Sequence, residues 1–404
     1  MILFRRLAVT VALCGLVACE NRSEVSAELD RPQLIAIRDT AFAENEARLP
    51  DQGMILHRIS SAAVTADGLV IVGLLSGGGA LVHVLDSIAR PIRSFGSEGG
   101  GPSEFAGVGD IIVGPDGYVG IHDPRRRRLL SGTLSPDSWT QGQRSAMIHA
   151  PVRPLPSTID GKVVFAEFRP MVEKGAAVMV TVLSPLDTIG MPIELGVTWP
   201  ADNQRSFGPR GGPTRLSYQI PTGCSAQYLI GGTGEQLIVA DPANASIRLR
   251  DLESASADPL PLRDVPDVTS KMVSNLRALV QPLTRPSSIR SPSGEVSEGY
   301  SLNQQQMDAL VNSLLVEGNP VPAVWDELLV DVDKDVIWLR LAECGTIPET
   351  ERWELYSIIG SHLGDVSLPP GHHILAVRSG KLITTYKDSM DVEHLAAWTI
   401  SGID

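Results

Sequence analysis

The chain has 404 residues, of which 47 are acidic and 34 are basic, and its formal net charge at pH 7 is −13. A dispersed negative charge of this size argues against nucleic acid as a partner and against adhesion to anionic lipid headgroups. The length alone would allow two or three domains, so internal repetition is the more informative observation.

The first residues have the pattern of an export signal. Arg5 and Arg6 precede a short apolar run, and small residues close the segment at positions 16–19, Leu-Val-Ala-Cys. These four residues resemble a bacterial lipobox, which implies cleavage after residue 18 and a lipid on Cys19. The alternative is an ordinary secretory signal in which Cys19 is incidental. Glu20 follows where Asp would retain a lipoprotein at the inner membrane, which favours the outer membrane or the periplasmic side. We expect a signal peptide over 1–18 and a lipidated tether over 19–31.

Hairpin signals recur along the mature chain. Asp67-Gly68, Asp116-Gly117 and Asp160-Gly161 each separate short β-rich runs, and they stand 44 to 49 residues apart. Weaker turns follow in the second half of the chain at Gly234-Glu235, Asp333-Lys334 and Ser379-Gly380. Because one such hairpin belongs to each four-stranded unit, six turns predict six propeller blades.

The segment from Phe95 to Leu130 carries a family resemblance. Its glycine-rich crossing ends in Gly-Pro-Ser-Glu-Phe at 101–105, its hairpin reads Pro-Asp-Gly at 115–117, and an aspartate, Asp123, precedes an arginine run. This order resembles the repeat of NHL-type six-bladed propellers. The end of the chain, from Trp338 to Leu395, is similar to exported six-bladed propellers that have no assigned activity. The resemblance implies an all-β, six-bladed β-propeller over 32–404.

Closure of such a ring requires a strand from the other terminus, because a propeller whose ends stay apart leaves exposed strand edges. The β-rich run at 33–37 is the candidate, and we expect it to complete the blade formed by residues 373–400.

Residues 266–322 are predicted to form a small helical and loop insertion in the propeller. Apolar residues at helical spacing occur in two runs, one from Val268 to Leu279 and one from Met307 to Leu314. Ser301 and Gln304 have the spacing of a capping box. Core packing is the plain interpretation of the apolar faces, and an exposed partner-binding stripe is the alternative.

Two cysteines remain in the exported part of the chain, Cys224 and Cys344. An oxidising compartment permits a disulfide between them, and two buried free thiols are the alternative. Neither has a partner at metal-ligand spacing, so no metal site is predicted from them.

Candidate site residues cluster around two repeated Asp-Pro sequences. In the resembling blades, Asp123 and Asp241 would cap turns by accepting backbone N–H bonds. The rival interpretation places His122, Asp123 and Asp241 at the central mouth, where propeller enzymes gather calcium or catalytic ligands. No complete set of catalytic residues can be matched, so no catalytic residue is assigned. Calcium is the only cofactor that this interpretation retains.

Two basic motifs receive structural interpretations. The run Arg125 to Arg128 is interpreted as a solvated strand edge rather than a phosphate-binding patch. His372 and His373 are interpreted as a surface pair whose side chains point to opposite faces of a strand.

These observations predict a lipid-anchored binding or scaffold module of the cell envelope, held to the membrane by the lipid on Cys19, with a protein or glycan partner. The alternative is a calcium-assisted, lactonase-like hydrolase or lyase with its site at the central mouth.

Overall fold

The structure is a computed structural model. It describes residues 31–135, 139–147, 152–155, 158–159, 161–171, 175–183, 193–199, 204–207, 216–219, 229–242, 244–251, 258–264, 274, 288–290, 296–298, 303–305, 308, 324–342 and 350–402. The predicted signal peptide and nearly all of the predicted tether, and also Cys19, Cys224 and Cys344, lie outside these residues.

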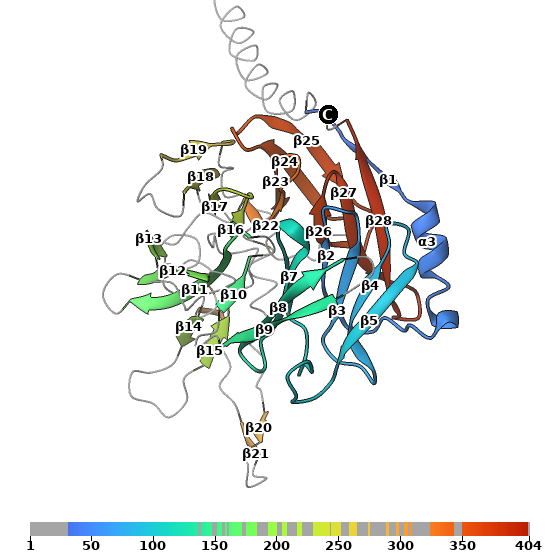
Figure 1. Cartoon of the computed structure of the whole chain (residues 1–404). Coiled ribbons are helices and arrows are strands. Elements are labelled where there is room, and N and C mark those ends of the chain that lie inside the picture. The colour runs from blue at the N-terminus through green and yellow to red at the C-terminus, as the bar shows by residue number, and fades with distance from the viewer. Residues whose placement is uncertain are drawn as a thin grey trace, which may run out of the picture.

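The described chain is a β-propeller, in which antiparallel sheets are arranged around a centre (Figure 1). The first sheet contains β2 (Ile59–Val64), β3 (Val70–Leu74), β4 (Ala80–Leu85) and β5 (Pro91–Ser97). The second contains β6 (Asp110–Val113), β7 (Tyr118–Asp123), β8 (Arg128–Leu134) and β9 (Trp139–Met147). The third contains β10 (Val152–Pro154), β11 (Val163–Met171), β12 (Gly175–Leu183) and β13 (Ile193–Trp199).

The second half of the chain repeats the arrangement. One sheet contains β16 (Leu229–Gly232), β17 (Leu237–Asp241), β18 (Ser246–Arg250) and β19 (Leu260–Pro261). The next contains β22 (Trp325–Asp331), β23 (Val336–Leu341), β24 (Arg352–Ser357) and β25 (His362–Ser367). The last contains β26 (His373–Arg378), β27 (Lys381–Lys387), β28 (Glu393–Ser401) and β1 (Ile35–Arg38). Each sheet is named below by its first strand, as the β22 sheet or the β26 sheet.

The prediction of a propeller is confirmed. Five blades are recognised in the structure, however, where six were predicted. The hydrogen-bonded sheets with four antiparallel strands nevertheless number six among the described residues. The six predicted hairpins all connect the first and second strands of these sheets. At four of them a glycine adopts the positive φ that the turn requires, 80° at Gly68, 72° at Gly117, 68° at Gly161 and 74° at Gly380.

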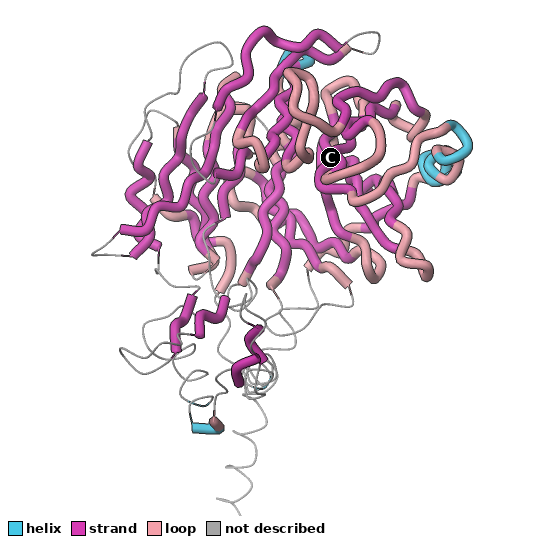
Figure 2. Tube along the Cα trace, turned by 90° about the horizontal axis from the view of Figure 1, so that it is seen from below, coloured by secondary structure: helices cyan, strands magenta, loops and turns pink. Residues whose placement is uncertain are grey.

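The first strands of the sheets surround the centre of the ring. β2 contacts both β6 and β26, and β22 contacts both β16 and β26. The tube view from below shows the strands of each sheet running side by side (Figure 2). Because the first strands run in the same sense, their first residues gather at one end of the ring. We call that end the mouth.

The predicted pairing of the N-terminal strand with the last sheet is confirmed. β1 pairs antiparallel with β28, with Ile35 opposite Ser401 and Arg38 opposite Trp398. Just before β1, the backbone N–H of Leu34 donates to the carbonyl of Asp365 at 2.9 Å. The N-terminal segment therefore covers the outer edge of β25 and then completes the β26 sheet.

Short helices follow β1. The side chain of Asp39 accepts from the N–H of Phe42 and so caps α3 (Thr40–Glu46). The 3-10 helix η1 (Pro50–Gln52) follows, and η2 (Pro115–Gly117) forms the β6–β7 turn. Helix α3 packs on β28. Among the described residues, no helix is both long and apolar enough to cross a bilayer.

Two further strand pairs complete the elements, β14 (Gln204–Phe207) with β15 (Leu216–Gln219) and β20 (Ser288–Arg290) with β21 (Val296–Glu298). The second pair lies within the predicted insertion, where residues 274, 304, 305 and 308 are helical. The rest of that insertion lies outside the described residues.

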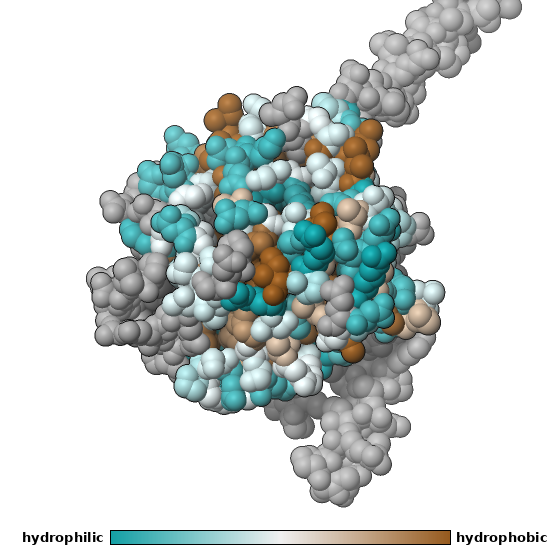
Figure 3. Space-filling model, turned by 45° about the vertical axis from the view of Figure 1, so that its right-hand side comes forward, coloured by the Kyte–Doolittle hydropathy of each residue, from teal (hydrophilic) through white to brown (hydrophobic). Residues whose placement is uncertain are grey.

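The core is formed where neighbouring sheets pack face to face. Three tryptophans are fully buried in and beside the β22 sheet, Trp325, Trp338 and Trp353. On the surface, hydrophobic residues form separate patches set among polar ones (Figure 3). Large apolar side chains that stay exposed include Ile35 and Ile37 of β1.

Candidate functional site

A cluster of charged side chains lies at the mouth, where the β22 and β26 sheets meet. Asp326 and Glu327 are the second and third residues of β22, and His373 is the first residue of β26. Arg340 stands opposite Glu327 on β23, and Glu351 immediately precedes β24. We call these five residues the mouth cluster.

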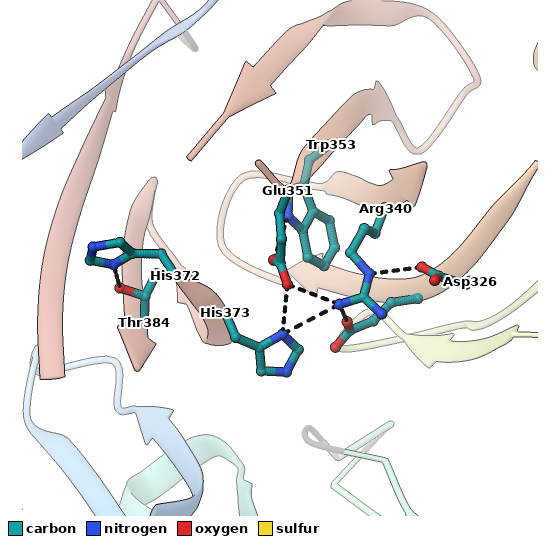
Figure 4. Close-up of polar contacts among 8 residues, drawn as sticks. Asp326, Arg340, Glu351, Trp353, His372, His373 and Thr384 are labelled. Carbon is teal, nitrogen blue, oxygen red and sulfur yellow. Dashed lines mark hydrogen bonds and ion pairs between the residues drawn. The ribbon is translucent and has the colours of Figure 1, made fainter. Parts of the chain in front are cut away.

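Arg340 is the centre of the mouth cluster. Its Nε donates to Asp326 Oδ1 at 2.7 Å, and its Nη1 lies 3.0 Å from both Glu327 Oε2 and Glu351 Oε1 (Figure 4). The guanidinium also lies 6.0 Å above the ring of the buried Trp353. Burial alone would lower the pKa of Arg340, but the surrounding carboxylates outweigh it and raise that pKa. A fixed positive charge therefore holds three carboxylates in place.

His373 joins the cluster from the neighbouring sheet. Its Nδ1 lies 3.0 Å from Glu351 Oε1, and Figure 4 shows the ring directed toward both Glu351 and Arg340. The hydrogen bond to Glu351 raises the pKa of His373 above its ordinary value. The side chain is 43% exposed, and no described residue forms a hydrogen bond with its Nε2. An oriented imidazole with one accessible nitrogen can accept or donate a proton, or bind a polar ligand group.

Glu327 and Glu351 are carboxylates in contrasting settings. Burial raises the pKa of Glu327, and the nearby Arg340 only partly offsets this. Burial acts in the same direction on Glu351, but the hydrogen bond from His373 and the charges nearby lower its pKa. The indole N–H of Trp353 also donates to Glu351 Oε2, at 3.3 Å. Glu351 is therefore stabilised in its charged form, whereas Glu327 is the carboxylate that is more easily protonated.

His372 points away from this cluster, as alternation along a strand predicts. Its ring stacks on Tyr386 at 4.5 Å between centroids, and its Nδ1 lies 3.0 Å from Thr384 Oγ1. His372 is buried, so the interpretation of the two histidines as a surface pair is wrong. The reason is that aromatic residues of β27 and β28, which follow later in the sequence, cover it.

The three histidine and aspartate candidates from the sequence lie in two other sheets. Asp123 is fully buried and accepts from the backbone N–H groups of Ala106 at 2.8 Å and Arg126 at 3.1 Å. Asp241, the last residue of β17, accepts from the Nδ2 of Asn244 at 2.8 Å, in the turn that follows the strand. Both aspartates have the contacts of turn-stabilising residues.

His122 has a different setting from the two aspartates. It is buried, and its Nδ1 lies 3.0 Å from Oδ2 of Asp110, the first residue of β6 at the mouth. Asp110 and His122 are also register partners across β6 and β7. The pair has the same position in its sheet as Glu327 and Arg340 have in the β22 sheet.

The arginine run is solvated only in part, because Arg125 and Arg127 are exposed whereas Arg128 is buried. Arg125 Nη1 donates to the carbonyl of Ala106 at 2.9 Å, and Arg126 Nη1 donates to that of Gly100 at 3.3 Å. Arg128 is buried and donates to the carbonyls of Gly101 and Glu104. The prediction fails for Arg128 because the glycine-rich crossing folds back over it and presents carbonyl groups to its guanidinium.

Sequence reasoning missed the mouth cluster altogether. Its members come from four strands or strand ends spread over 48 residues, and no fixed-spacing motif joins them. The available signal was positional, because charged residues at the start of an innermost strand must lie at the mouth. Across the described part of the chain, no group of three or more His, Cys, Asp or Glu side chains could hold a metal ion.

No family model matches the chain, and no curated protein matches its sequence. Among solved structures, an exported protein from Bacteroides fragilis aligns with a TM-score of 0.47 at 9% identity, covering 91% of this chain and 95% of that chain. A streptogramin B lyase gives 0.40 at 11% identity, covering 91% and 97%. U3-55K gives 0.44 at 10% identity, covering 85% and 96%. No activity is carried over from these likenesses.

Proposed function

We propose that this chain is a lipid-anchored, extracytoplasmic propeller that binds a protein or glycan partner at its mouth. The observation that carries the proposal is the mouth cluster, in which Arg340 fixes three carboxylates while the His373 side chain stays 43% exposed. Charged groups at the end of an innermost strand are not needed to fill a core. A rigid frame that presents oriented polar atoms is the general form of a recognition site.

We infer further that the six sheets form one ring of six blades. The first strands of five of them are linked by contacts in the order β16, β22, β26, β2, β6, and β6 also contacts β10. The remaining junction is supported by Gly232 of β16. A Cβ there would meet Ile159 Cδ1 at 2.8 Å and Leu155 Cδ1 at 3.6 Å, and both residues lie in the connection between β10 and β11 of the β10 sheet.

The lipobox-like segment at 16–19 supports the proposed attachment to the membrane. With Cys19 as the anchor, only 11 residues lie between the lipidated cysteine and Arg31, the first described residue. A tether of that length keeps the propeller within roughly 45 Å of the membrane even when fully extended.

Site-specific photocrosslinking in living cells tests the proposed binding. A photoreactive residue at Pro370, which is exposed in the turn just before β26, should form an adduct with the partner. The matched control is Asp67, exposed in the β2–β3 hairpin at the opposite end of the ring. Mass spectrometry of the adduct distinguishes an attached peptide from an attached sugar. Equal labelling from both positions, or none from position 370, would refute binding at the mouth.

A companion variant tests the anchor in the same cells. Cys19→Ser should move the protein from the membrane fraction to the soluble fraction and abolish incorporation of labelled palmitate. If the variant stays in the membrane fraction, lipid anchoring is wrong, although binding at the mouth would still stand on the crosslinking result.

A further inference from the structure

The seam between the β22 and β26 sheets is held at both ends by polar contacts of different kinds. At the end away from the mouth, Asp331 Oδ1 accepts from the N–H of Ser379 at 2.8 Å and Oδ2 accepts from that of Gly380 at 2.6 Å. Asp333 also accepts two hydrogen bonds from Arg378, at 2.9 and 3.0 Å.

The contacts at this far end involve no histidine. Arginine stays protonated in proteins, and the hydrogen bonds from Arg378 and Ser379 lower the pKa of Asp333 despite its partial burial. Asp331 is buried and receives backbone N–H groups, which do not titrate. The far end of the seam is therefore a fixed pin.

The mouth end depends on a histidine, whose charge changes with pH. His373 Nδ1 contacts Glu351 Oε1 at 3.0 Å and lies 3.3 Å from Arg340 Nη1. The other charged groups that face it are Glu327 and Asp326 of β22. On its other side, β2 carries no titratable residue, and the β27 partner of His373 is Thr385. No second ion pair across this end of the seam occurs among the described residues.

We propose that the mouth end of this seam is a proton-controlled contact, in which protonated His373 holds the β26 sheet against Glu351 and loss of the proton loosens it. The physical reason is that the imidazolium and the carboxylate form a charge-assisted hydrogen bond. Neutral imidazole loses this charge assistance, because its Nδ1 then either donates an ordinary hydrogen bond to Glu351 or accepts one from Nη1 of Arg340 at 3.3 Å. The pin at the far end makes the movement a hinge at the mouth and not a separation of the sheets.

The sign of the pH dependence follows from the two shifts. The pKa of His373 is raised on folding, so its contribution is complete below the ordinary pKa of about 6.5 and is lost as pH rises through the folded value. The pKa of Glu351 is lowered, so its contribution is complete above its ordinary value of about 4.3 and is lost as pH falls through the folded value. The contact is therefore strongest from about pH 4.3 to 6.5 and weakens above that window.

Hydrogen–deuterium exchange of the full-length chain in detergent micelles tests the hinge. After correction for intrinsic exchange rates, amides of residues 369–376 should exchange roughly three- to tenfold faster at pH 8 than at pH 6. Residues 379–384, beside the fixed pin, should show no such difference. His373→Gln should exchange at the same corrected rate at both pH values.

A second readout follows the proton itself. The Trp353 indole N–H donates to Glu351, so its NMR signal should titrate with His373. This titration should vanish in His373→Gln and persist in the matched variant His394→Gln, whose ring contacts Glu46 and Asp388 instead. If the Trp353 signal titrates while exchange at 369–376 stays constant, the hinge is overturned. The same holds if His373→Gln keeps the pH dependence of the exchange.

Discussion

At the residue scale, the strongest buried polar contact is centred on Glu354 of β24. Its side chain is fully buried and receives Nη1 of Arg31 and of Arg263 on one oxygen. The other oxygen accepts from the indole of Trp325 at 2.8 Å and lies 3.3 Å from the hydroxyl of Tyr356. Four donors thus converge on one carboxylate, two from its own sheet and two arginines from outside it, so Glu354 joins the N-terminal segment and the end of the β16 sheet to the β22 sheet.

Loss of that carboxylate should be costly. Glu354→Gln keeps the size of the side chain but leaves two partly buried guanidinium groups without an anion, so we expect the free energy of unfolding to fall by about 3 kcal/mol. Urea unfolding of the full-length chain measures this. Glu44→Gln on the exposed face of α3 is the control and should change the value by less than about 0.5 kcal/mol. Equal effects from the two variants would show that Glu354 does not join these segments.

At the element scale, β1 decides how the ring closes. The last sheet has only three strands from the C-terminal region, and β28 would present an open edge without β1. Four residues of β1 pair with β28, and residues 32 and 34 exchange hydrogen bonds with Asp365. Such edges are sites of unwanted strand pairing when they are left exposed.

Removal of this strand should therefore destabilise the whole ring. Deletion of residues 20–38 removes about six interstrand hydrogen bonds, worth roughly 0.5 to 1 kcal/mol each, and also the contact of Arg31 with Glu354. We therefore expect a loss of at least about 3 to 6 kcal/mol together with a tendency to self-associate. Chemical unfolding and light scattering measure the two effects. Deletion of 20–30 alone, which leaves the paired residues in place, is the matched control. A similar loss from the shorter deletion would assign the stability to the tether and not to strand pairing.

At the scale of the whole molecule, the ring depends on close approach between neighbouring sheets. Glycines at the inner strand β16 permit that approach on both sides. A Cβ on Gly231 would meet Leu328 Cδ2 at 2.1 Å in the β22 sheet, and one on Gly232 would meet Ile159 in the β10 sheet. A side chain at either position would overpack the junction.

A double-mutant cycle tests whether the β10 and β16 sheets are neighbours in a six-sheet ring. Gly232→Ala should cost about 1 to 3 kcal/mol of unfolding free energy through overpacking. In the background of Ile159→Ala, which removes the opposing atoms, the cost should fall by about 1 kcal/mol or more. Gly234→Ala, whose Cβ meets no atom within 4 Å, should be additive with Ile159→Ala. Additivity of Gly232→Ala would contradict the ring of six.

Much of the fold could be predicted from the sequence. The Asp-Gly and Ser-Gly turns fixed the positions of the hairpins, because a tight hairpin needs residues that tolerate positive φ and this requirement is local. The need to cover an open edge then predicted that the strand at 33–37 pairs with the last sheet. The repeat of hairpins predicted the propeller, since each short sheet can bury its faces only against its neighbours.

The mouth cluster could not be predicted in the same way. Charges at the start of β22 and His373 at the start of β26 come together only when two sheets pack side by side, and no local preference encodes that contact. The burial of His372 and Arg128 also depends on residues far away in the fold or in a folded-back loop. The sequence by itself determined the elements and their turns, because these depend on local backbone energetics. The tertiary structure decided which charges meet, because that depends on how whole sheets pack around the ring.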